Sequence, residues 1–159
     1  MPGKYFRRGE DGSSLIEFAL CLPPLLLLMT GIFAFGITIG NYVMLTNAAS
    51  VGAMQLAVSR GQLASPGYDP CATAVAAIEA AAPSLTGSKM TFAFSLDGTA
   101  YAANTTTCSS SSQTTGAAAL LVSGQPITVT VTYPCNLAVY RANTFPSCSL
   151  SAKASEVVQ

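Results

Sequence analysis

Residues 12–40, GSSLIEFALCLPPLLLLMTGIFAFGITIG, decide how this chain is built. Glu17 is the last charged residue before Arg60, so residues 18–59 carry no charge at all. A helix needs about 20 consecutive apolar residues to span the hydrocarbon core of a bilayer. We therefore expect one transmembrane helix over about residues 15–39.

The charges that flank this run predict its orientation. Lys4, Arg7 and Arg8 precede it, and Arg60 is the next basic residue after it. The positive-inside rule places the N-terminus in the cytoplasm and the residues after about position 45 outside. A cleaved secretory signal is the competing interpretation. It fits poorly, because the apolar run is long, contains Glu17 and lacks an A-x-A site after it.

The sequence beyond the apolar run remains compatible with a helix. After Pro23 and Pro24, no proline occurs before Pro66. A helix over residues 13–60 would be about 70 Å long and would protrude well beyond the membrane. Each of the two early prolines removes a helical hydrogen bond, so we expect a bend there.

Two pairs of small residues lie four positions apart in this helix. They are Gly36 with Gly40 and Ala48 with Gly52. Such pairs allow two helices to approach closely, but they also arise often by chance. Both interpretations therefore stay open.

Composition narrows the classes of function. Half of the 159 residues are hydrophobic, 9% are charged, and there is no histidine. Seven acidic residues balance seven basic ones, so no overall field favours nucleic acid. The charged residues after Arg60 form no nucleophile–base pair and no phosphate-binding loop. We expect no enzymatic activity, no cofactor and no metal site.

Five cysteines divide between the apolar run and the region outside it. Cys21 lies within the run and is expected to act as a small hydrophobe. Cys71, Cys108, Cys135 and Cys148 would lie in an oxidising compartment and form two disulfides. Three pairings exist. We favour Cys135–Cys148, which closes a short loop worth about 3 kcal/mol, and Cys71–Cys108 by elimination.

The region outside the membrane begins with a linker at residues 61–70, followed by an outer domain at 71–159. Asp69 and Pro70 are typical of the N-cap and first position of a helix. The alanine-rich residues 71–82 form that short helix in our prediction, and Pro83 ends it.

Alternating apolar and polar residues predict the strands of this domain. The alternation occurs in residues 90–96, 127–133 and 149–158. Asp97-Gly98 is a typical hairpin turn, so residues 99–103 should return beside the first strand. We expect an α+β fold with a three- to four-stranded antiparallel sheet, packed on the short helix or the long one.

The start of the apolar run contains a charge that needs an explanation. A carboxylate such as Glu17 costs up to a few kcal/mol when it is buried near a membrane surface. Cleavage between Gly12 and Ser13 would create an amine four residues from Glu17, in the same or a neighbouring subunit. The alternative is an interfacial carboxylate that reaches water.

These residues resemble the processing site of type IV prepilins: a short basic leader, a glycine, then a hydrophobic helix with Glu at its fifth mature position. The run GSSLIEFALCLPPLLLL, with GIFAFG and NAAS after it, is more specifically similar to the TadE-like family. That family comprises pseudopilin-type proteins of bacterial tight-adherence (Flp/Tad) pilus systems. The strong similarity covers about residues 9–60. Phe18 follows the glutamate where major pilins often carry Tyr, which agrees better with the minor branch.

The resemblance implies a function and a set of partners. Residues 1–12 would be a leader that a prepilin peptidase removes after Gly12, and Glu17 would set the register of assembly. The protein would be a pseudopilin or minor pilin of a Tad/Flp-type pilus. Its partners would be that peptidase, other pilin or pseudopilin subunits, the inner-membrane assembly machinery and the bilayer. It would lie in the bacterial inner membrane with a periplasmic outer domain, and would enter an extracellular pilus on incorporation.

Two alternatives stay open. One is a filament-forming, pilin-like major subunit. The other is a single-pass anchor that displays a binding or adhesion domain and has no role in a pilus. The second alternative predicts no cleavage at Gly12 and no dependence on Glu17.

Overall fold

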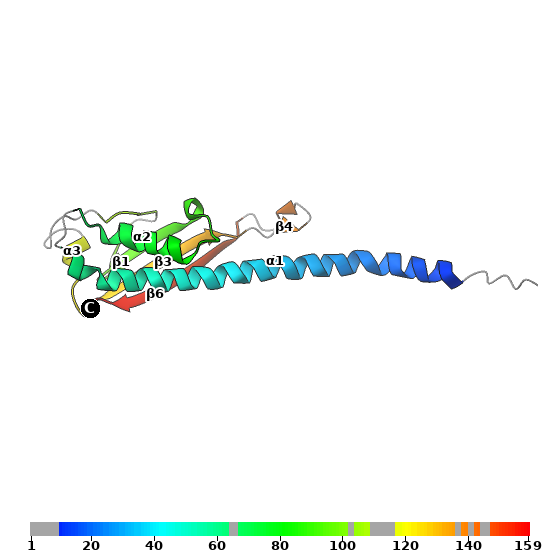
Figure 1. Ribbon diagram of the computed structural model, residues 1–159, viewed down its shortest axis with the longest axis horizontal. Helices are drawn as coiled ribbons and strands as arrows, with labels where there is room; N and C mark the ends of the chain where they lie inside the picture. Colours follow the sequence, from blue (N-terminus) through cyan, green and yellow to red (C-terminus); the bar gives the residue numbers. More distant parts are fainter. Residues whose placement is uncertain are drawn as a thin grey trace, which may run out of the picture.

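A single long helix forms the axis of the molecule. The computed structural model describes residues 10–63, 67–101, 104–108, 117–135, 138–139, 142–143 and 147–159. Helix α1 (Glu10–Val58) has 49 residues, about 73 Å, and continues into the short 3-10 helix η1 (Ser59–Gln62). Figure 1 shows the other elements gathered along the C-terminal half of α1. The expected long helix is therefore present, and the N-terminal half projects from the domain.

The ends and the interior of α1 follow from its sequence. The helix is described from Glu10, three residues before the expected start. It continues through Pro23 and Pro24 without a break. The bend expected at these prolines stays a prediction.

The second helix matches the short helix expected from the alanine-rich segment. Helix α2 (Pro70–Ala81) begins after Asp69, whose side chain accepts a hydrogen bond from the backbone N–H of Ala72. The 3-10 helix η2 (Gly87–Lys89) follows. The 3-10 helix η1 includes the first two residues of the linker expected at 61–70. Residues 64–66 of that linker lie outside the described residues.

Four antiparallel strands form the main sheet in the order β2-β1-β3-β6. They are β1 (Thr91–Leu96), β2 (Thr99–Ala100), β3 (Pro126–Pro134) and β6 (Ser149–Val157). Asp97 and Gly98 both have positive φ angles, 47° and 75°, which confirms the hairpin turn between β1 and β2. The α+β fold with an antiparallel sheet is thus confirmed. The expected return strand over 99–103 is shorter than predicted, and residues 102–103 lie outside the described residues.

Three short elements are absent from the sequence prediction. They are helix α3 (Ala117–Leu120) and the paired strands β4 (Ala138–Val139) and β5 (Ala142–Asn143). Elements of two to four residues are too short to show a hydrophobic period, so no sequence pattern predicts them. Strand β4 lies beside α1, closer to its N-terminal half than the main sheet does (Figure 1).

The register of the sheet separates an inner face from an outer face. Phe92 and Phe94 pair with Val131 and Val129, and all four side chains are buried. This inner face belongs to one hydrophobic core with α1 and α2, and α1 lies against β3 and β6. The outer face carries the alternate residues, which are mostly Thr and Ser. The predicted alternation in all three strands is confirmed.

Candidate functional site

The N-terminal half of α1 is not covered by any other part of the chain that the structure describes. Every residue from Gly12 to Thr30 is exposed, including most of the large apolar side chains of the run. Among the described residues, α1 with η1 (12–62) is the one helix long and apolar enough to cross a membrane, and none of its most apolar stretch is buried. A helix that is apolar on all sides requires lipid or other apolar helices around it. This half of α1 is therefore a candidate membrane anchor and a candidate assembly surface.

The C-terminal half of the same helix is built into the outer domain. Buried residues recur every three to four positions, which is the period of one helix face. They are Leu45, Ala48, Ala49, Gly52, Ala53, Leu56 and Ala57. This face packs against α2 and the inner face of the sheet. Small residues dominate it, so the other elements can approach the α1 backbone closely.

Gly52 marks a close approach between α1 and α2. A Cβ atom at Gly52 would lie 2.4 Å from Cγ1 of Ile78, a fully buried side chain of α2. The pair Ala48 and Gly52 therefore serves packing within one chain. At Gly36 and Gly40, by contrast, an added Cβ would meet no atom of the described residues within 4 Å.

The face of α1 that points away from the domain carries exposed apolar side chains beyond the predicted span, interspersed with the polar residues Thr46, Asn47 and Ser50. Val43, Met54 and Val58 are exposed there, and Met54 retains 61% of its accessible surface. The bilayer accounts for about 20 residues of helix. Met54 and Val58 lie well past the predicted end of the span, so the bilayer does not account for their apolar exposure.

The residues expected to direct processing and assembly lie together at the N-terminal end of α1. Gly12, Ser13 and Glu17 are all exposed. Ser13 and Glu17 are four positions apart, so their side chains share one face of the helix. The Gly12–Ser13 bond lies in the first turn, where backbone N–H groups lack helical partners and the helix opens most easily.

Two disulfides fasten the outer domain, and they have the pairing that the sequence favoured. They join Cys71 to Cys108 and Cys135 to Cys148. Cys21 is a free cysteine and is exposed on the apolar half of α1. The disulfides therefore lie entirely within the domain and leave the apolar half of the helix without covalent constraint.

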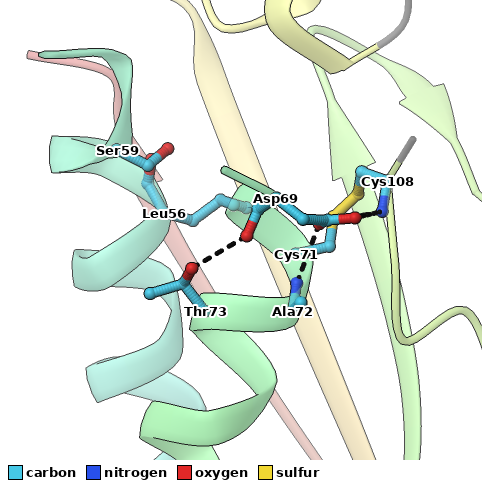
Figure 2. Close-up of a disulfide and its surroundings, with 7 residues drawn as sticks. All are labelled: Leu56, Ser59, Asp69, Cys71, Ala72, Thr73 and Cys108. Atoms are coloured by element: carbon cyan, nitrogen blue, oxygen red, sulfur yellow. Dashed lines mark hydrogen bonds between the residues drawn. A yellow bond between two sulfur atoms is a disulfide. The ribbon is translucent and has the colours of Figure 1, made fainter. Parts of the chain in front are cut away.

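Asp69 connects the first disulfide to the start of α2 (Figure 2). Its carboxylate accepts hydrogen bonds from the backbone N–H of Ala72 at 2.9 Å and from that of Cys108 at 3.0 Å. Its own carbonyl oxygen accepts one from the Thr73 hydroxyl at 2.8 Å. The sequence predicts the helix cap by Asp69 but not its hydrogen bond to the N–H of Cys108. The two residues are 39 positions apart, and no local pattern indicates that they are neighbours.

The ligating atoms of Asp69, Cys71 and Cys108 lie within 4.8 Å of one another, a spacing that could suit a metal ion. Here the two sulfur atoms are bonded to each other, and the carboxylate accepts backbone N–H groups. A thiolate is the form that binds metals, so a disulfide removes two of the three ligands. The cluster fastens α2 to the chain around Cys108.

Comparison with protein families identifies the segment that contains the predicted site. Residues 12–54 match the family model described as TadE-like protein. This match confirms the resemblance seen in the sequence, and it suggests a protein associated with a Tad pilus. It covers just over a quarter of the chain, from Gly12 into the buried part of α1. No curated protein and no solved structure matches the chain.

The limits of the TadE-like match coincide with a division in the structure. The matched residues include Glu17, both prolines and the small residues that pack on α2. The main sheet and both disulfides lie after the matched segment. Any function specific to the outer domain must therefore be argued from its own surface.

Proposed function

We propose that this protein is a pseudopilin or minor pilin that acts in the assembly or structure of a Tad/Flp-type pilus. The observation that carries the proposal is the TadE-like segment in a helix whose N-terminal half is apolar and exposed on all sides. The bilayer would hold this half before assembly. The helices of neighbouring subunits would replace the lipid afterwards.

The apolar surface of α1 supports assembly more than a plain membrane anchor. A single-pass anchor needs about 20 apolar residues. Here the uncharged run extends over residues 18–59, and Met54 and Val58 expose apolar surface on the side that the domain leaves open. A neighbouring helix that packs along α1 would cover these side chains and the membrane half in one continuous contact.

Processing would occur after Gly12, in a segment that suits proteolysis. A peptidase must draw the chain into an extended form around the cleaved bond. The first turn of α1 opens at low cost, and a Cβ added at Gly12 would meet none of the described side chains within 4 Å. The basic residues Lys4, Arg7 and Arg8 would hold this end at the cytoplasmic surface, with the outer domain in the periplasm.

Glu17 would set the register between subunits. Cleavage leaves a charged amine at Ser13, and an apolar environment strengthens its attraction to a carboxylate. A neighbouring helix that brings its own Ser13 amine to Glu17 would satisfy both charges. A neighbour shifted by one turn would leave each charge unpaired in an apolar environment, which costs several kcal/mol.

The proposal is tested in cells that contain an active prepilin peptidase. We expect the intact mass and N-terminal sequence of the extracted, unreduced protein to show a chain that starts at Ser13 and lacks four hydrogens. Gly12→Leu should retain the leader. Glu17→Gln should be processed but fail to join the pilus, whereas Glu79→Gln, which removes an exposed carboxylate of the outer domain, should assemble normally.

An intact leader in the wild-type protein would contradict the proposal and would favour the membrane-anchored binding module. Normal assembly of Glu17→Gln would contradict the role of the carboxylate in register. Subunit abundance in purified pili separates a minor pilin from a filament-forming major subunit.

A further inference from the structure

The outer face of the main sheet contains a hollow of about 230 Å³. It is lined by Ala93, Ser95, Ala100, Thr128, Thr130 and Lys153. The register places Lys153, Thr130 and Ala93 side by side across three strands. On this outer face β1 and β2 contribute the small residues Ala93, Ser95 and Ala100, whereas β3 and β6 contribute threonines and Lys153. It lies opposite the face that α1 and α2 cover.

Lys153 is the one charged side chain in the lining. Its neighbours on the same face are Thr130 across the strand and Ser151 and Ser155 along it. Glu156 lies on the other face, since it is three residues away on the same strand. No acidic side chain among the described residues forms an ion pair with Lys153. The ammonium group therefore remains available to an anion.

The other polar groups around the hollow are neutral hydroxyls. The Thr128 and Ser155 hydroxyls lie 2.9 Å apart, and their hydrogen bond orients both. Phe94 and Tyr101 also line the hollow, but both side chains pack with the core. Burial raises the pKa of the Tyr101 hydroxyl above its ordinary value, so this group adds no charge to the hollow. A ligand would meet one cation surrounded by hydroxyl groups.

We propose that this hollow binds a carboxylated sugar, such as one uronic-acid unit of an acidic polysaccharide. The ammonium of Lys153 pairs with the carboxylate, and the threonine and serine hydroxyls exchange hydrogen bonds with those of the sugar. Neighbouring strands lie about 5 Å apart, so their hydroxyls suit the width of one sugar ring. The volume suits one ring and is smaller than the pockets that hold drug-sized ligands, which start at about 300 Å³.

The lining also argues against other ligands. Phe92 and Phe94 face inward, and Tyr101, the other ring at the hollow, is partly buried against the core, so the described residues offer no fully exposed ring here to stack on a neutral sugar. The lining offers no exposed large apolar side chain that would hold a peptide. Because the hollow lies away from α1, a ligand can bind while α1 is held in a membrane or a filament. The proposal does not depend on the proposed pilus function.

The test uses the full chain in detergent micelles with its disulfides intact. The probe is a short oligogalacturonate, and its methyl ester serves as the uncharged control of the same shape. Titration followed by ligand-detected NMR should show saturable binding of the acid, at least tenfold weaker binding of the ester, and weaker binding of the acid at high salt.

Variants then locate the site. Lys153→Gln should weaken binding at least tenfold, and Ala93→Leu should weaken it similarly because the new side chain fills the hollow. Lys89→Gln, which removes an exposed cation of η2, should bind like the wild type. Equal affinity for acid and ester, wild-type binding by both Lys153→Gln and Ala93→Leu, or no saturable binding would each overturn the proposal. So would equal affinity for a short poly-glutamate peptide, since the site would then recognise anionic chains in general.

Discussion

The two halves of α1 share one uninterrupted helix but have opposite environments. Residues 12–30 are exposed on every side, whereas residues 45–57 bury a continuous face in the outer domain. Neither half carries a charge after Glu17. The difference lies in the size of the side chains. The N-terminal half presents leucine, isoleucine and phenylalanine all round, and the C-terminal half presents mainly alanine and glycine towards the domain, with Leu45 and Leu56 among them.

This comparison shows why hydropathy alone cannot divide the helix. Bulky apolar side chains on all sides suit lipid, which needs no particular shape. A face of small residues suits a fixed protein neighbour, because close backbone approach gives many van der Waals contacts. Gly52 and its contact with Ile78 therefore mark the part of α1 that belongs to the domain.

The largest expected effect comes from charges placed on the two exposed surfaces of α1. Leu27→Arg combined with Leu28→Arg puts two charges near the centre of the predicted span, at a cost of about 5–7 kcal/mol to insertion. Met54→Arg combined with Val58→Arg changes side chains with similar exposure that would lie in water. Alkaline extraction of membranes should release the first double variant and retain the second. If alkaline extraction released both double variants, or retained both, the result would contradict the division of α1 into a membrane half and a domain half.

The second prediction tests whether the outer domain can lose stability without any change in membrane insertion. Cys71→Ala combined with Cys108→Ala removes a link between residues 37 positions apart, which is worth about 4 kcal/mol in the loop-entropy model. We expect the outer domain to unfold at lower denaturant concentration, as followed by circular dichroism in detergent. Membrane insertion should not change. Loss of insertion would show that the two halves of α1 do not act separately.

The smallest effect tests the small-residue face itself. Gly52→Val forces a side chain against Ile78, and overpacking of this kind costs about 1–3 kcal/mol. Gly40→Val makes the same change where an added Cβ meets no atom of the described residues within 4 Å. Chemical denaturation should show destabilisation of the outer domain by the first substitution only. Similar midpoints for the two variants would refute the close α1–α2 contact.

Much of this architecture could be predicted from local patterns. The uncharged run predicts α1, Asp69-Pro70 predicts the start of α2, and Asp97-Gly98 predicts the β1–β2 turn. The alternating runs give the faces of β1, β3 and β6 correctly. Each of these features depends on residues that are close in the sequence, where propensity and period act directly.

Other features depend on contacts between residues that are distant in the sequence, so they could not be predicted from local patterns. From the sequence, the Ala48–Gly52 pair is equally compatible with a contact between subunits. The position of Ile78 against Gly52 in the structure shows a contact within one chain. The bond from Asp69 to the N–H of Cys108 follows from the disulfide beside it. The hollow beside Lys153 depends on the strand order, which alternation alone does not give.

Cysteine labelling along the exposed side of α1 tests the division of the helix most directly. Single substitutions in a Cys21→Ala background would place the thiol at Leu20, Leu27, Ile32, Met54 or Val58, all exposed in the monomer. In sealed spheroplasts, a membrane-impermeant maleimide should label Met54→Cys and Val58→Cys and leave the other three unlabelled. Rapid labelling of Leu20→Cys, Leu27→Cys and Ile32→Cys would place this half of α1 in water and contradict the account.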